Sequence, residues 1–442
     1  MDRISADAAV PPLTTEPGPL DTRPSGRVSS WALRTGAGRT ATESRPASRP
    51  DARAGSRPDS RPGSPPGGET LGGHTSRQVL RLCEAAGLGG ADSADYARTL
   101  LAALGPAAER PLALPPSADC FLSDDHTPVE FSLSFVPGAA PTLRVLLEPG
   151  FGADGLAANG RSGLRAVRAM ARRWGFGTRR LDELEDLFFP PAPEGPLALW
   201  CALELLPGGV PKVKVYLNPA AAGQERSADT VREALHRLGH RQAFAALPEG
   251  DRHLFFALDL GAWEKPRAKV YLTHRNLSAT AAAGLSRMDG GPTRSEVERF
   301  FRTAAGHGTA AGTGGRDSPA GTGPSLHRRP GITCHAFTET GSARPSGFTL
   351  HIPVRDYARH DGEALDRAVA VLRRHGMDPA PLVRALSAVT ARRPEDGVGL
   401  IAYLALVHQQ GRPPRITAYV SSEAYAVRPP AAEVRVPAGA AL

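Results

Sequence analysis

Lys212-Val-Lys-Val-Tyr216 and Arg267-Ala-Lys-Val-Tyr271 are the two segments that decide the fold predicted for this chain. In both, charged or tyrosine side chains alternate with apolar ones, which is typical of a β-strand with one polar and one apolar face. All four lysines of the chain lie in or beside these segments, whereas the other basic residues are arginines. A lysine kept where arginine is the default indicates a need for a compact ammonium group.

Three more segments show related alternation, so the pattern is a repeat. They are Thr142-Leu-Arg-Val-Leu146, Gly347-Phe-Thr-Leu-His351 and Arg415-Ile-Thr-Ala-Tyr419. Each of these segments follows a turn that contains Gly or Pro and an earlier strand-like segment, so each is the second strand of a predicted hairpin. The expected first strands span residues 129–135, 199–206, 254–260, 333–338 and 400–407, and the expected second strands span residues 142–147, 212–217, 267–272, 348–353 and 415–420.

The order of the elements predicts an α+β fold built from five ββαα repeats, because amphipathic helical patterns fill the intervals between the hairpins. Helices must cover the apolar face of each hairpin, which leaves the polar faces to converge. Ten antiparallel strands arranged in this way predict a closed barrel, with helices outside and a polar lumen inside.

The composition changes along the chain and predicts where the barrel begins and ends. Residues 1–75 contain Ser-Arg-Pro four times and few apolar residues, which indicates a disordered tail rich in Arg, Ser and Pro. Residues 76–430 form the predicted single barrel domain. Within it, the Gly-rich residues 305–331 are expected to be a flexible insertion. Residues 431–442 are expected to be a C-terminal tail.

Five cationic residues share the predicted lumen face: Arg144, Lys214, Arg267, Lys269 and Arg415. Buried cations are costly without a neutralising anion, and several converging cations fit a diphosphate better than a single carboxylate. Tyrosines follow two positions after Lys214 and Lys269, and aromatic faces stabilise cations and exclude water. A diphosphate beside an aromatic cage is what the ionisation of an allylic diphosphate requires.

With these segments placed, the sequence resembles the dimethylallyltryptophan synthase family, which are aromatic prenyltransferases with an ABBA barrel. The resemblance covers residues 76–430 and rests on the order and spacing of four motifs, which are Thr127-Pro-Val-Glu-Phe-Ser132, Lys214-Val-Tyr216, Arg267-Ala-Lys-Val-Tyr271 and Arg415-Ile-Thr-Ala-Tyr419. It implies transfer of a prenyl group from its diphosphate to an indole acceptor. The prenyl group expected first is dimethylallyl, and the acceptor expected first is L-tryptophan or a derivative. The reaction would be an electrophilic aromatic substitution that requires no cofactor, so that Mg²⁺ is not essential.

The resemblance also implies roles for individual residues. The five lumen cations would hold the diphosphate. The shield around the allylic cation would be formed by Tyr216, Tyr271 and Tyr419. Glu130 would accept a hydrogen bond from the indole N–H and raise the nucleophilicity of the ring. Alternation places Glu130 on one face of its strand with Ser132, which allows it to point into the lumen.

Two positions depart from the family pattern. His351 lies where the other units place tyrosine, and it is expected either to contact the diphosphate, to alter substrate preference, or to be structural. Many relatives carry a lysine on the first strand of the second unit, which is proposed to remove the ring proton. Residues 199–206 contain no lysine, and Glu204 is the candidate base there because it alternates with Trp200 and Ala202.

Composition narrows the setting in which the protein works. No apolar run is long enough for a transmembrane helix, and the first residues lack the pattern of a signal peptide. The four cysteines are widely separated, which favours neither a disulfide framework nor a zinc site. We therefore expect a cytoplasmic monomer or homodimer whose partners are a prenyl diphosphate and an aromatic small molecule, without nucleic acid or membrane.

Two alternatives stay open from the sequence alone. The acceptor could be another aromatic compound, such as a phenol, a phenazine or a cyclic dipeptide, because pocket shape decides this choice. Outside the enzymes, the formal net charge of +8 is compatible with a basic RNA-binding protein. The chain lacks the aromatic motifs of RNA-binding sheets, which disfavours this second alternative.

Overall fold

The computed structural model describes residues 68–261, 263–306 and 325–431. The predicted tails fall largely on residues 1–67 and 432–442, which lie outside the described residues, as does 307–324 of the expected insertion. Helix α1 (Leu71–Ala85) nevertheless begins inside the segment assigned to the N-terminal tail. The hydroxyl of Thr70 caps this helix by accepting a hydrogen bond from the N–H of Gly73, at 3.1 Å. The two glycines in its first turn had hidden the helical pattern.

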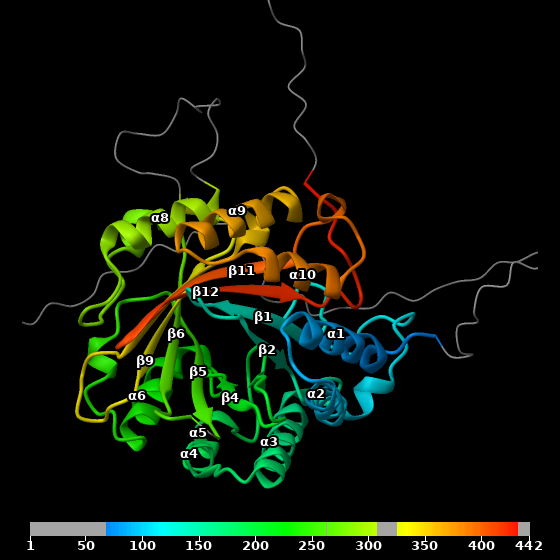
Figure 1. Ribbon diagram of the computed structural model, residues 1–442. Coiled ribbons are helices and arrows are strands. Elements are labelled where there is room, and N and C mark those ends of the chain that lie inside the picture. The colour runs from blue at the N-terminus through cyan, green and yellow to red at the C-terminus, as the bar shows by residue number, and fades with distance from the viewer. Residues whose placement is uncertain (1–67, 262, 307–324, 432–442) are drawn as a thin grey trace, which may run out of the picture. The chain divides into compact units, whose positions relative to one another are not determined.

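The ten predicted strands form a closed barrel, which confirms the expected fold class (Figure 1). Around the barrel the order is β1-β12-β11-β10-β9-β6-β5-β4-β3-β2, and every neighbouring pair is antiparallel. The strands are β1 (Val129–Phe135), β2 (Thr142–Leu147), β3 (Leu199–Glu204), β4 (Lys212–Leu217), β5 (Arg252–Leu260), β6 (Ala268–His274), β9 (Gly331–Phe337), β10 (Gly347–Ile352), β11 (Ile401–Gln409) and β12 (Arg412–Ser421). Closure leaves no edge strand in the barrel to pair with another chain.

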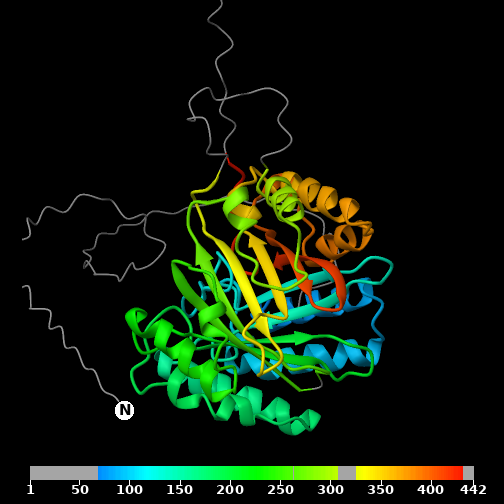
Figure 2. The ribbon, with the colours of Figure 1, turned by 90° about the vertical axis from the view of Figure 1, so that its left-hand side faces the viewer.

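Helices lie outside the ring of strands, as both views show (Figures 1 and 2). They are α1, α2 (Gly90–Leu104), α3 (Gly155–Trp174), α4 (Arg179–Asp182), α5 (Glu185–Phe188), α6 (Ser227–Arg237), α7 (Ala279–Ala282), α8 (Arg294–Ala305), α9 (Asp361–Arg374) and α10 (Ala380–Val389). Helices precede each hairpin, so the described chain opens with α1 and α2 and its last hairpin is β11–β12.

A small two-stranded sheet was not expected from the sequence. It pairs β7 (Leu277–Ser278) with β8 (Ser325–Leu326), and β8 falls within the predicted insertion at 305–331. Strand β9 also begins at the end of that segment, with Gly331. The described end of the insertion is therefore part of the fold. A strand of two residues is too short to leave an alternating pattern in the sequence.

The alternation of each strand separates two environments. On β4, Val213, Val215 and Leu217 are completely buried on the outer face of the barrel. Helix α5 covers the next strand in the same way, where Phe188 stacks on Phe256 at 5.5 Å between ring centroids. Burial of one such apolar side chain stabilises the fold by roughly 1.5–3 kcal/mol. The opposite face of each strand, which carries the polar residues, is therefore directed into the lumen.

Candidate active site

The lumen brings together the residues that the sequence assigned to one site. Its pocket is lined by ten of them, from β1, β2, β4, β6, β10 and β12 and the turn before β6: Glu130, Arg144, Lys214, Tyr216, Arg267, Lys269, Tyr271, His351, Arg415 and Tyr419. Glu204 lies instead at the mouth of the barrel, in an adjoining cavity of about 310 Å³ that also contacts Arg267 and Arg415. The two spaces thus meet at these two arginines.

Three of the lumen cations surround an acid that the sequence analysis missed, Asp259 on β5. Its Oδ2 accepts a hydrogen bond from Nε of Arg267 at 2.5 Å. Its Oδ1 lies 3.8 Å from Nζ of Lys214 and 3.9 Å from Nζ of Lys269. Burial alone would raise the pKa of Asp259, but the three cations outweigh it and hold the pKa at about 2. Asp259 is therefore a permanent anion among the cations.

Arg144 has a different partner, Glu204. Nε and Nη2 of Arg144 donate to Oε2 of Glu204 at 2.9 and 2.7 Å, and Nζ of Lys212 lies 3.6 Å from Oε1. Burial would raise the pKa of Glu204, but these cations, led by Arg144, lower it to about 2. A carboxylate with so low a pKa is a weak proton acceptor. The geometry therefore argues against Glu204 as the base and assigns it to holding Arg144.

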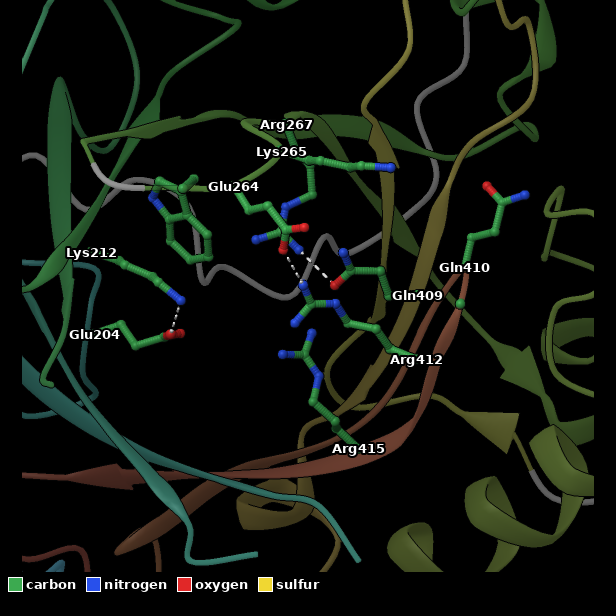
Figure 3. A pocket seen from close by; sticks show the side chains of 11 residues that line it. Glu204, Lys212, Glu264, Lys265, Arg267, Gln409, Gln410, Arg412 and Arg415 are labelled. Atoms are coloured by element: carbon green, nitrogen blue, oxygen red, sulfur yellow. Dashed lines mark hydrogen bonds and ion pairs between the residues drawn. The ribbon is translucent and has the colours of Figure 1, made fainter.

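The mouth cavity contains the least compensated cation. Figure 3 shows Arg267, Gln409, Arg412 and Arg415 gathered on one side of this cavity. Nη1 of Arg267 donates to Oε1 of Gln409 at 3.0 Å, whereas the guanidinium group of Arg415 has no hydrogen bond or ion pair within the described part of the chain. Burial, together with repulsion from Arg144 and Arg267, lowers the pKa of Arg415 to about 10. An anion bound here would relieve that repulsion.

Aromatic rings form a band next to the cations. Tyr216 and Tyr271 have ring centroids 5.7 Å apart, and Tyr271 lies 6.0 Å from His351. His351 in turn lies 5.7 Å from Tyr419. Phe255, which was not predicted from the sequence, packs against Tyr216 and Tyr271 with ring centroids 5.9 and 5.8 Å apart. Such a band presents aromatic faces to a group that lies between it and the cations, and it excludes water from that group.

His351 belongs to this aromatic band, which favours a role beside the tyrosines over contact with the diphosphate. Burial lowers the pKa of His351 to about 4, so the ring is neutral at physiological pH. With Nδ1 donating to the carbonyl of Ile332 at 3.3 Å, Nε2 accepts from the hydroxyl of Tyr419 at 3.2 Å. A neutral imidazole held in this way continues the ring of tyrosines, and it supplies no positive charge to a phosphate.

Glu130 is the titratable group that stands apart from the ion pairs. It lines the lumen and is only 5 % exposed, and its carboxyl group makes no hydrogen bond or ion pair with the residues that the structure describes. Burial raises the pKa of Glu130 to about 8, although Arg355 opposes this shift. Burial of a carboxyl group without a hydrogen-bond partner destabilises the fold. The position of Glu130 therefore favours a ligand that brings a hydrogen-bond donor.

Comparison with known proteins shows to which family the chain belongs. The model of the family described as tryptophan dimethylallyltransferase matches residues 95–381. The chain belongs to this family. It is therefore an aromatic prenyltransferase, a conclusion that decides between the enzyme and the RNA-binding alternative.

Solved structures of similar proteins extend the match over most of the chain. PriB, in a ternary complex with L-tryptophan and dimethylallyl thiolodiphosphate, is 63% identical, with 82% of this chain and 99% of that chain covered and a TM-score of 0.78. The 5-dimethylallyl tryptophan synthase from Streptomyces coelicolor, in complex with DMASPP and Trp, is 64% identical, with coverage of 84% and 99% and a TM-score of 0.77. The 6-dimethylallyltryptophan synthase from Micromonospora olivasterospora is 39% identical, with coverage of 82% and 100% and a TM-score of 0.73. Among the described residues of this chain, no helix is long and apolar enough to cross a membrane.

Proposed function

We propose that this prenyltransferase moves a dimethylallyl group from its diphosphate to the indole ring of tryptophan, without needing a metal ion. The observation that carries the proposal is one lumen with three adjoining parts. These parts are a group of cations, a band of aromatic rings and the unpaired carboxyl group of Glu130. The similar proteins whose structures contain tryptophan together with a dimethylallyl thiolodiphosphate or DMASPP support this choice of substrates.

The cations act first, because the bond that breaks joins the allylic carbon to the diphosphate oxygen. Its electron pair leaves with the diphosphate, so negative charge grows there in the transition state. Preorganised cations lower the energy of that state more than the energy of the bound substrate. Arg267 and Arg415 are placed where the lumen meets the mouth, and Lys214 and Lys269 lie deeper. Together with Arg144, they supply the charge that a divalent metal ion provides in other enzymes.

The aromatic band acts on the other fragment, the allylic cation. Tyr216, Tyr271 and Tyr419 present π-faces to this cation, and the neutral His351 completes the band. A protonated histidine would repel the cation, so the lowered pKa of His351 is part of the shield. The band also excludes water, which would otherwise capture the cation as an alcohol.

Glu130 acts on the acceptor. When the indole ring attacks the allylic cation, positive charge develops on the ring and on its N–H. A carboxylate that accepts this N–H gains interaction energy as the charge grows, and so stabilises the transition state selectively. Because burial favours protonated Glu130 in the empty lumen, the N–H and the nearby cation must together favour its ionised form. The ring then becomes aromatic again by losing its proton to the diphosphate product, because Glu204, with its pKa of about 2, is not suited to receive it.

The decisive experiment is incubation with dimethylallyl diphosphate and a panel of acceptors in the presence of EDTA. The panel contains tryptophan, a phenol, a phenazine and a cyclic dipeptide, and products are identified by mass spectrometry and NMR. We expect prenylated tryptophan as the dominant product. Faster turnover of an acceptor without an indole would overturn the proposed acceptor, and a complete lack of transfer to any acceptor would overturn the prenyl donor as well.

A further inference from the structure

We propose that Asp259 is a positioning residue, which keeps the cations of the diphosphate site in place and charged before the diphosphate arrives. The inference rests on the function proposed above, and it adds a residue that does not itself touch the substrate. Its side chain is completely buried behind Arg267, Lys214 and Lys269. Asp259 therefore acts on the diphosphate only through these three side chains.

The two oxygens of Asp259 hold their partners in different ways. Oδ2 is bonded to Arg267 twice, by Nε at 2.5 Å and by the backbone N–H at 3.3 Å. Oδ1 accepts no hydrogen bond from the described residues, and both lysine ammonium groups lie beyond hydrogen-bond distance from it. The guanidinium group is thus fixed in orientation, whereas the two ammonium groups are attracted and remain free to turn their N–H bonds towards phosphate oxygens.

Without this acid, the cations would respond unequally. A buried lysine can relieve repulsion by losing its proton, but an arginine cannot. Four other charged or titratable groups face Lys269. Two of them are the cations Arg267 and Lys214, and the other two, Cys334 on β9 and His351 on β10, are neutral. Burial, Arg267 and Lys214 already hold the pKa of Lys269 well below its usual range, and Asp259 opposes them. Loss of the acid should therefore make Lys269 lose its proton at a lower pH.

The second ion pair of the lumen provides a matched control. Glu204 pairs with Arg144 as Asp259 pairs with Arg267. Its nearest lysine is the partly exposed Lys212, at 3.6 Å, and neither of its oxygens lies within 4 Å of Lys214 or Lys269. Arg144 stays charged at every accessible pH. Glu204→Gln should therefore weaken diphosphate binding by misplacing Arg144, with little change in how that binding depends on pH between 6 and 9.

The experiment measures binding of inorganic pyrophosphate by calorimetry at several pH values between 6 and 9. Each variant is expressed as a ratio to the wild type at the same pH, so that the ionisation of pyrophosphate itself cancels. For Asp259→Asn we expect this ratio to fall about tenfold as the pH rises from 6 to 9, which corresponds to the loss of one charge-assisted contact. For Glu204→Gln we expect a reduced but constant ratio. For Asp259→Glu, which keeps the charge and moves it, we expect a constant ratio of about one tenth or less.

A second readout uses the small number of lysines. Because the chain has only four, lysine-selective ¹³C labelling gives four side-chain NMR signals, and a Lys269→Met variant identifies one of them. In Asp259→Asn, the signal of Lys269 should titrate at a lower pH than in the wild type. A purely structural role for Asp259 would leave both this titration and the pH profile of binding unchanged.

The outcomes separate the inference from the function on which it rests. If wild-type protein does not bind pyrophosphate, the cation site itself is wrong and the proposed function fails with the inference. If the wild type binds and Asp259→Asn shows a flat ratio, only the inference is overturned. Should Asp259→Asn fail to fold, Asp259→Glu still decides, because affinity equal to that of the wild type would show that the position of the acid does not matter.

Discussion

Replacing Glu130 with glutamine should abolish most of the activity and yet stabilise the fold, with a stabilisation that grows as the pH rises. In the folded protein burial raises the pKa of Glu130 from 4.5 to about 8. Above pH 4.5 the unfolded chain therefore ionises this group freely, while the folded protein keeps it protonated. The wild type consequently loses stability at this position as the pH rises through that window, until the folded state also ionises near pH 8.

The magnitude follows from the two pKa values. By linkage, Glu130 lowers the free energy of unfolding of the wild type by about 1 kcal/mol at pH 5 and about 3 kcal/mol at pH 7, relative to a residue that does not titrate. Glutamine keeps the size and one acceptor oxygen of the side chain. The stability difference between the variant and the wild type should therefore increase by roughly 2 kcal/mol between pH 5 and 7.

The assay is urea unfolding of both proteins at pH 5, 6 and 7, with Glu225→Gln as a control on an exposed glutamate. At saturating substrates, kcat for tryptophan should fall by roughly 10²-fold, the scale of lost general-base or electrostatic assistance. The apparent affinity for the prenyl diphosphate should change little. A stability difference that stays constant with pH would refute the burial argument. Wild-type turnover by the variant would refute the role of Glu130 towards the acceptor N–H.

Three further predictions test other parts of the lumen. Lys214→Ala and Lys269→Ala should each weaken binding of the prenyl diphosphate by about 1.5–3 kcal/mol, because each removes a charge-assisted contact. KM for tryptophan should remain nearly unchanged, and the control Lys265→Ala, at the exposed mouth, should have a smaller effect. Turnover should survive EDTA, and loss of activity that magnesium restores would contradict a metal-independent reaction. Removal of residues 1–67 should leave the melting temperature and kcat nearly unchanged, since the sequence of that segment lacks apolar periodicity; a large loss of either would show that the segment contributes to the fold or site.

The barrel strands could be predicted where alternation is strict and a turn limits the strand. The expected ranges of β1, β2 and β4 agree with the structure at both ends. Strand β12 was expected at 415–420 but begins at Arg412, because Pro413 and Pro414 interrupt the pattern that marks a strand. The helices occupy the intervals between the hairpins, as expected, with α1 and α2 before the first hairpin. Periodicity identifies the elements, but it does not say which helix covers which pair of strands.

The site was harder to predict because it depends on register between strands. Asp259 alternates with apolar neighbours, as any solvent-facing acid on a sheet would, and only the pairing of β4 with β5 places it opposite Lys214. Phe255 was overlooked for the opposite reason, since an aromatic residue in a strand is expected in the apolar core. His351 differs again, because only its burial makes it a neutral member of the aromatic band.

The charges of the lumen account for why a diphosphate, and not a smaller anion, is the fitting ligand. Five cations contribute to the site, and two of the acids paired with them, Asp259 and Glu204, have pKa values of about 2 and stay ionised. Glu130 adds no charge while it is protonated. Lys212 also pairs with Glu204, so the cations outnumber the ionised acids even when both acids are counted. A single carboxylate would compensate less of this excess than a diphosphate, which carries several negative charges. In the function that we propose, the two acids lower the excess positive charge of the lumen, and protonated Glu130 adds no charge to it until the acceptor arrives.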